Sequence, residues 1–208
     1  MDWSAPASAV VPSLDAVVLG VLAGVTEPIS GREVHRRARR GSNSGVQLIL
    51  TRMTAHGLLD VIDAPPTRLY SLNRDHVAAP AALLLLDLRG QLFDRIRDTF
   101  AGWNPAPVAA AVFGSAARGE GGVDSDLDLI VVRPETVPDD HPSWSNQVYA
   151  LERLVRRWSG NPATIILVTP TQLVDMVDRA EPVVESLQED AMALTTVSVL
   201  DLLREARP

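Results

Sequence analysis

Two aspartates separated by one residue, Asp126 and Asp128, stand where the chain passes into the unbroken apolar run 129–132. Acidic and apolar residues that alternate before such a run are typical of a strand that leaves a solvated edge and enters a buried sheet. Side chains two residues apart on a strand share a face, with Cα atoms roughly 6.6 Å apart. Neighbouring carboxylates repel each other unless a cation lies between them, and Mg²⁺ combines few carboxylates with water and phosphate oxygens. We therefore predict that Asp126 and Asp128 bind Mg²⁺.

A glycine and a serine precede this pair, at the end of another apolar stretch. Residues 108–113 are expected to form a strand, which Gly114 and Ser115 would turn into a short helix. A glycine lets a phosphate come close to the backbone, and backbone N–H groups and the Ser115 hydroxyl can donate hydrogen bonds to it. Arg118 adds positive charge and Ser125 directly precedes the aspartate pair, so both join Gly114 and Ser115 as candidate nucleotide-binding residues.

Each half of the pattern has a simpler explanation. An isolated Asp-x-Asp at a strand end is most often a solvated rim or a turn, and an isolated Gly-Ser pair is only a turn. The combination is more specific, because a strand, Gly-Ser, a spacer and an Asp-x-Asp that enters a second strand must occur in that order.

At these residues the chain resembles the nucleotidyltransferase superfamily related to DNA polymerase beta, in particular its small bacterial, or minimal, members. Their Gly-Ser, spacer, Asp-x-Asp signature is matched by Gly114, Ser115, Asp126 and Asp128, within residues 105–168. The resemblance implies that the two catalytic aspartates hold Mg²⁺ on a nucleoside triphosphate while Gly114 and Ser115 bind its β and γ phosphates. A hydroxyl of a protein, an RNA end or a small molecule would attack the α phosphorus and release pyrophosphate. Minimal members often act as antitoxins that modify a partner toxin.

The chain departs from this family at one position. Active members usually have a third carboxylate on a later strand, where it helps to hold a second metal ion and can accept the acceptor's proton. The corresponding strand is expected at residues 163–168, which contain no acidic residue, so Thr164 or Ile166 would occupy that face. The sequence thus favours nucleotide binding more strongly than transfer. The alternative function is a transcription regulator whose second domain has lost transfer and serves as a nucleotide sensor or dimerisation module.

The amino-terminal part combines helical periodicity with a hairpin pattern. Ser13 is expected to cap the first helix, and Ser30 and Glu33 have capping-box spacing at the start of the second. Helices are expected at about residues 13–25, 30–38 and 42–57, followed by strands at 58–62 and 68–72. This order indicates a winged helix-turn-helix, and residues 42–73 resemble small bacterial winged-helix regulators, including the arsenic-repressor-like group. A helical bundle with an incidental hairpin is the alternative.

If the third helix reads DNA, the side opposite its apolar stripe should face the bases. Gln47 is the best base-reading candidate, because its amide can pair with adenine through two hydrogen bonds. The predicted DNA-binding residues are Arg36, Arg37, Arg39, Arg40, Asn43, Ser44, Gln47, Thr51, Arg52 and Arg68. The alternative is that these arginines only form the solvated face of a short helix.

Composition limits the other possibilities. The chain has 208 residues, 46% of them hydrophobic and 22% charged, as in ordinary globular proteins. It contains no cysteine and no lysine, which excludes disulfides, thiol catalysis, cysteine-ligated zinc and a Walker lysine. No apolar stretch is long enough to cross a membrane and no signal peptide is recognisable, so we expect a cytoplasmic protein. Residues 81–208 hold 11 arginines against 19 acidic residues, a charge balance that disfavours general nucleic-acid binding there.

These patterns together predict an α/β protein in which a winged helix-turn-helix precedes a nucleotidyltransferase-like mixed sheet flanked by helices. The expected organisation is a loose tail (1–12), the winged-helix domain (13–80), an apolar connecting helix (81–104) and the nucleotidyltransferase-like domain with its terminal helices (105–208). A homodimer is expected, because the connecting helix is apolar on all sides and winged helices often read paired half-sites.

Overall fold

The computed structural model describes residues 1–205, which divide into two compact units. One unit is Ala5–Leu88, and the other combines Met1–Ser4 with the chain from Arg89 onward. Each unit has hydrophobic core residues of its own. Within the described residues, no helix is both long enough and apolar enough for a membrane span.

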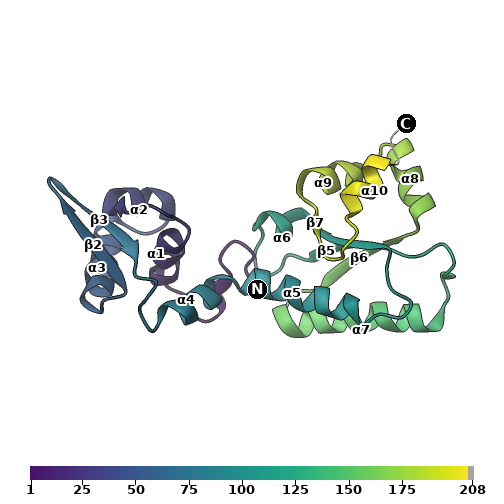
Figure 1. Ribbon diagram of the computed structural model, residues 1–208, viewed down its shortest axis with the longest axis horizontal. Helices are drawn as coiled ribbons and strands as arrows, with labels where there is room; N and C mark the ends of the chain where they lie inside the picture. The colour runs from purple at the N-terminus through teal and green to yellow at the C-terminus, as the bar shows by residue number, and fades with distance from the viewer. Residues whose placement is uncertain (206–208) are drawn as a thin grey trace. The chain divides into compact units, whose positions relative to one another are not determined.

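The Ala5–Leu88 unit consists of helices and a small antiparallel sheet (Figure 1). The strands pair in the order β1-β3-β2, and the buried core includes Val18, Val34, Leu50 and Tyr70. In chain order the elements are η1 (Pro6–Ala9), α1 (Leu14–Ala23), β1 (Ile29–Ser30), α2 (Gly31–Ala38), α3 (Asn43–Ala55), β2 (Leu59–Ala64), β3 (Thr67–Leu72) and α4 (Ala79–Leu86). The three expected helices and the hairpin are therefore present, whereas β1 is too short to leave a periodic pattern in the sequence.

Serine side chains begin two of these helices. The Ser30 hydroxyl accepts a hydrogen bond from the Glu33 N–H at 3.2 Å, and the Ser42 hydroxyl accepts one from the Gly45 N–H at 3.1 Å. Ser13 was expected to cap α1, but its hydroxyl instead donates to the Asp15 carboxylate at 3.1 Å and makes no cap. The Asp15 carboxylate competes for the hydroxyl because it lies only two residues away.

The second unit is a four-stranded mixed sheet with helices on both faces (Figure 1). The strand order is β6-β5-β4-β7; β5 and β6 are parallel, whereas β4 is antiparallel to both β5 and β7. Its elements are α5 (Leu88–Ala101), β4 (Ala109–Phe113), α6 (Gly114–Arg118), β5 (Leu127–Val132), α7 (Pro142–Ser159), β6 (Ala163–Val168), α8 (Pro170–Asp178), α9 (Pro182–Asp190), β7 (Met192–Ala193) and α10 (Val199–Glu205). The mixed α/β class expected from the sequence is confirmed.

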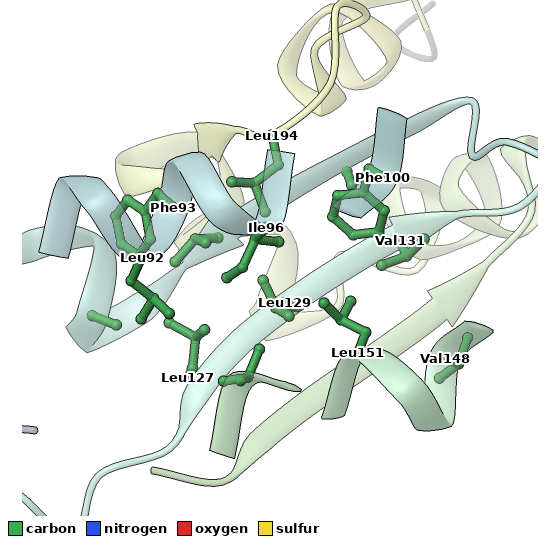
Figure 2. Close-up of a cluster of buried hydrophobic side chains, with 14 of the residues drawn as sticks. Leu92, Phe93, Ile96, Phe100, Leu127, Leu129, Val131, Val148, Leu151 and Leu194 are labelled. Carbon is green, nitrogen blue, oxygen red and sulfur yellow. The ribbon is translucent and has the colours of Figure 1, made fainter. Parts of the chain in front are cut away.

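Alternate residues of the central strands face the two helical layers. Leu127, Leu129 and Val131 of β5 pack against α5 and α7, as Figure 2 shows for this cluster. Ile130 and Val132 of the same strand pack on the opposite face with residues of α8, α9 and α10. A strand buried on both faces must be apolar at nearly every position, which explains the continuous run after Asp128.

Two segments differ from expectation. A single connecting helix was predicted over residues 81–104, but the chain forms α4 and α5 with a break at Asp87, and Phe93, Ile96 and Phe100 of α5 belong to the core beneath the sheet. The prediction of a loose tail over residues 1–12 is wrong for Trp3, which is 1% exposed and packs in the same core. Burial of so large an aromatic side chain stabilises the ordered terminus.

The buried sheet gives a stability prediction. Leu129→Ala, in β5, should lower the free energy of unfolding by about 3 kcal/mol because it leaves a cavity in a fully buried core. The matched change Leu167→Ala, at a position 42% exposed on the neighbouring strand, should cost about 1 kcal/mol or less. Urea unfolding followed by tryptophan fluorescence reports on this unit alone, since it contains all four tryptophans. Equal losses in the two variants would contradict the assigned burial.

Candidate functional site

The two predicted catalytic aspartates lie at the start of β5. Asp126 immediately precedes the strand and is exposed, whereas Asp128 is the second residue of the strand and is half-buried. In the sheet, Asp128 is paired with Phe113 of β4 on one side and with Thr164 of β6 on the other. The acidic pair therefore lies where the central strand leaves the buried sheet.

Thr164 and Ile166 lie on β6, the strand where the resemblance implies a third carboxylate, and Thr164 is the one beside the aspartates. It is the register partner of Asp128, and its hydroxyl donates a hydrogen bond to Asp126 Oδ2 at 2.9 Å. Directly opposed cross-strand residues share a face of a sheet, so the hydroxyl belongs to the acidic cluster. A neutral hydroxyl orients the Asp126 carboxylate but supplies no charge for a second metal ion.

Gly114 brings the backbone against Asp128. It has a φ of 72°, and a Cβ atom placed on it would lie 2.8 Å from Asp128 Oδ2. A side chain here would both strain the backbone and clash with the carboxylate, so the close approach requires glycine. The structure thus places Gly114 of the Gly-Ser pair beside the Asp-x-Asp motif, although twelve residues separate Gly114 from Asp126.

Asp190, at the end of α9, is part of this site and was missed by the sequence analysis. Its Oδ1 accepts a hydrogen bond from the Gly114 N–H at 2.9 Å, and its Oδ2 forms an ion pair with Arg118. Its side chain is only 7% exposed. Arg118 also contacts Glu120, with 2.8 Å between Nε and Oε2. Two predicted phosphate donors, the Gly114 N–H and the Arg118 guanidinium, are therefore both occupied by the Asp190 carboxylate.

The two serines have different surroundings. The Ser125 hydroxyl accepts a hydrogen bond from the Gly122 N–H at 3.0 Å, and its carbonyl accepts one from the Asn161 amide at 2.9 Å, so Ser125 holds the loop before β5. Ser115 is half-buried, and a Cβ atom placed on Gly121 would lie 3.1 Å from its hydroxyl. The glycine-rich loop therefore passes close to Ser115.

Burial and neighbouring negative charges together determine the electrostatics of the site. Burial raises the pKa of Asp128, and the nearby negative charges of Asp126 and Asp190 raise it further. Within residues 1–205 no three acidic or histidine side chains are arranged to hold a metal ion by themselves. Two mutually repelling carboxylates nevertheless fit a Mg²⁺ ion that takes its other ligands from water and phosphate.

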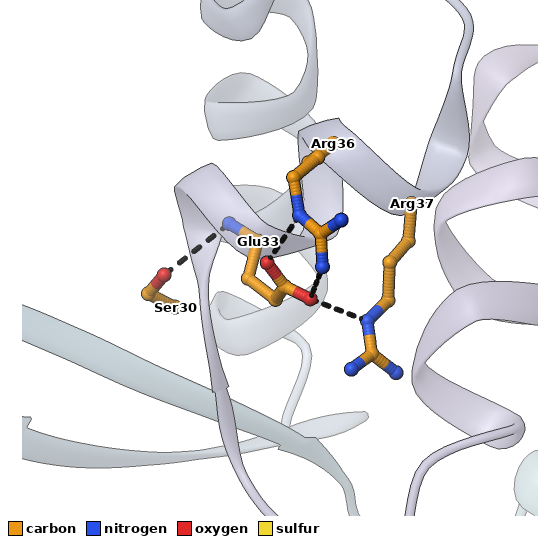
Figure 3. A network of polar contacts seen from close by, with 4 residues as sticks. All are labelled: Ser30, Glu33, Arg36 and Arg37. Atoms are coloured by element: carbon orange, nitrogen blue, oxygen red, sulfur yellow. Dashed lines mark hydrogen bonds and ion pairs between the residues drawn. The ribbon is translucent and has the colours of Figure 1, made fainter.

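Ion pairs within the amino-terminal unit occupy most of the arginines predicted to contact DNA. Figure 3 shows Arg36 and Arg37 on the carboxylate of Glu33, where their hydrogen bonds lower the pKa of Glu33 to about 2. Arg52 pairs with Asp15, and Arg68 pairs with Asp63 of the opposite strand at 2.9 Å. Glu33 thus binds arginines and does not close the expected capping box. Of the predicted set, Arg39 and Arg40 form no ion pair with any of the described residues and are exposed.

The outer face of α3 differs from the predicted one at Gln47. Asn43, Ser44, Thr51 and Arg52 are exposed as expected. Gln47 is half-buried, however, because its amide fills the space beside Gly31: a Cβ atom on that glycine would lie 2.1 Å from Gln47 Nε2. Leu48, which the periodicity did not single out, is 72% exposed on this helix instead.

The repulsion at Asp128 predicts a pH-dependent stability. The pKa of Asp128 is raised in the folded protein, so protonation of this carboxyl stabilises the fold. That stabilisation is lost as the pH rises through the raised pKa. In EDTA at pH 7, Asp128→Asn should therefore unfold about 1–3 °C above wild type, and the gain should vanish near about pH 3. The exposed neighbour change Asp124→Asn should have no such effect. A thermal-unfolding series that finds Asp128→Asn less stable at pH 7 would contradict the assigned repulsion.

Comparison with known proteins finds a family model that matches the segment containing the two aspartates. Residues 94–184 match the family model described as "Nucleotidyltransferase domain". No curated protein matches the chain. Among solved structures, the chain is similar to human N-acetylserotonin methyltransferase in complex with SAM, at 20% identity and a TM-score of 0.30; the match covers 45% of this chain and 31% of the methyltransferase.

The family match includes α6, β5 and β6, and with them the Gly-Ser pair and both aspartates. Residues 94–184 of the chain are therefore similar to nucleotidyltransferase domains.

Proposed function

We propose that the second unit binds a Mg²⁺–nucleoside triphosphate and transfers its nucleoside monophosphate to a hydroxyl acceptor. The observation that carries this proposal is the convergence of Asp126, Asp128 and the Gly114 backbone at one edge of the sheet, inside the segment matched as a nucleotidyltransferase domain. Each feature alone is common, but their meeting in space joins a metal-binding pair to a phosphate-binding turn.

The residues have separate roles in this proposal. Asp126 and Asp128 would hold Mg²⁺, which stabilises the negative charge that develops on the phosphates. Thr164 orients Asp126 through its hydrogen bond. Backbone N–H groups near Gly114, the Ser115 hydroxyl and Arg118 would bind the β and γ phosphates. The acceptor oxygen would form a bond to the α phosphorus and release its proton to water, as the bond from the α phosphorus to the α,β-bridging oxygen breaks and pyrophosphate leaves.

A second candidate function is nucleotide sensing without transfer. It is favoured by Thr164, because the residue opposite Asp128 on β6 can neither accept the acceptor's proton nor bind a second metal ion as a carboxylate would. The two functions share the binding step and differ only in the chemistry that follows. Measurements of binding and of transfer therefore separate them.

We expect Asp128→Asn to weaken the binding of Mg²⁺–triphosphate at least about tenfold, since one of two charged metal ligands is lost. Calorimetry with each of the four nucleoside triphosphates measures binding, and α-labelled triphosphates incubated with cell lysate measure transfer. Asp124→Asn, a nearby exposed change of the same type, should retain wild-type binding.

Binding without transfer of label would favour the sensor, and label transfer that Asp128→Asn abolishes would favour the enzyme. If wild type and Asp128→Asn bind with equal affinity, or neither binds any triphosphate, the proposed site is wrong.

We further propose that the amino-terminal unit is a winged helix-turn-helix that binds DNA. The order α1-β1-α2-α3-β2-β3 supports this, since α3 would then read the major groove and the β2-β3 hairpin would form the wing. The exposed residues Asn43, Ser44 and Thr51 of α3 remain candidates for base contacts. The arginines paired with Glu33 and Asp63 are weaker candidates for phosphate contacts, because DNA would have to compete with these carboxylates.

Substitution of Arg40 is the most direct test of the proposed DNA interface, because this arginine is exposed and forms no ion pair with a described residue. Arg40→Ala should reduce the slope of log K against log salt by about 1, the effect of losing one phosphate contact. Arg157→Ala, an exposed arginine of the other unit, is the control and should leave binding unchanged. Mobility shifts of genomic fragments over a salt series measure both. The absence of any shift by the wild type at low salt would refute DNA binding.

A further inference from the structure

We propose that Asp190 occupies the phosphate position of the Gly114 turn in the unliganded protein, and that a triphosphate binds in exchange for it. The inference rests on the proposed function and adds a regulation of the same site. Asp190 lies outside the matched segment 94–184 and 76 residues after Gly114 in the sequence.

The contacts of Asp190 are those that a phosphate would make. One carboxylate oxygen accepts from the Gly114 N–H at 2.9 Å and the other pairs with Arg118. Two oxyanion oxygens of a phosphate need the same kinds of donor, a backbone N–H and a guanidinium. The Asp190 side chain is only 7% exposed, whereas the Arg118 side chain is 42% exposed, so the guanidinium remains open to an incoming anion.

Charge makes the two occupants exclude each other. Asp126, Asp128 and Asp190 gather at one place, and the only positive group that the described structure pairs with them is Arg118, which is shared with Glu120. A triphosphate bound beside all three carboxylates would add further negative charge to a partly buried site. Exchange avoids this, since the incoming phosphate takes over the donors as Asp190 leaves.

Asp190 lies beside a short edge strand. It is the last residue of α9, and the two-residue strand β7 that follows pairs with Ala111 and Val112 of β4, after which the Leu194 N–H donates to the Ala110 carbonyl at 2.8 Å. Short edge elements with few hydrogen bonds open more readily than a central strand such as β5. Arg118 keeps a partner during the exchange, because Glu120 remains on its Nε.

Removal of the charge at residue 190 should therefore strengthen nucleotide binding. We expect Asp190→Asn to lower the Kd for Mg²⁺–triphosphate by about tenfold or more, which corresponds to releasing one charge-assisted hydrogen bond. Glu189→Gln removes the same charge one residue earlier, from an exposed position, and should leave the Kd unchanged. Calorimetry measures both, and tryptophan fluorescence checks that each variant is folded.

Amide hydrogen exchange on the wild-type protein tests whether a triphosphate displaces Asp190, without the need for a substitution. Addition of Mg²⁺–triphosphate should slow exchange around residues 114–119 and speed it around residues 187–193, because Asp190 is released. A purely structural role of Asp190 would leave the second segment unchanged or more protected.

The outcomes separate this inference from the proposed function. If wild type and Asp190→Asn bind equally and binding still requires Asp128, the site is correct and the exchange is wrong. Weaker triphosphate binding by folded Asp190→Asn would also overturn the proposed displacement of Asp190. Slower amide hydrogen exchange at residues 187–193 on addition of triphosphate would overturn it too. If neither protein binds any triphosphate, the proposed function fails and the exchange fails with it.

Discussion

The burial of a carboxylate beside other carboxylates, at the end of a central strand, is the constraint on which the site depends. Asp128 belongs to a central strand whose following residues are buried on both faces, so its position is set by the core and not by its own electrostatics. Burial and its acidic neighbours raise its pKa, which means that the fold holds the carboxylate where its ionised form is disfavoured. Such a cost is typical of sites that are completed by a ligand of opposite charge.

The surrounding residues either orient this charge or offset it. Thr164 donates to Asp126, while Arg118 pairs with Asp190 across the turn that begins at Gly114. The Gly114 backbone lies so close to Asp128 that a side chain would not fit. The same turn therefore lies beside both the aspartates proposed to bind the metal ion and the groups proposed to bind phosphate.

The parts of the molecule that could be predicted from sequence are those governed by local periodicity. The strands at residues 109–113, 127–132 and 163–168 and the helix Pro182–Asp190 follow from apolar patterns and from proline at helix starts. Asp126, Asp128, Gly114 and Ser115 could be proposed from the sequence because they form one short motif. Asp190 could not be found in this way, because its contact with Gly114 depends on how α9 returns to the sheet. The half-buried Gln47 and the buried Trp3 differ from the expected exposure for a related reason: each packs against residues distant in sequence.

β7, the strand that follows Asp190, is an edge strand of the sheet. β7 covers β4 with only two paired residues, Met192 and Ala193, and is the shortest element of its unit within the described chain. Unpaired backbone N–H and C=O groups on a sheet border are a template for an extended segment of another protein. Detachment of β7 would expose such a template on β4, whose residues are otherwise wholly interior. The end of α9 thus leads directly into β7, the strand that protects the backbone groups of β4 from pairing with another chain.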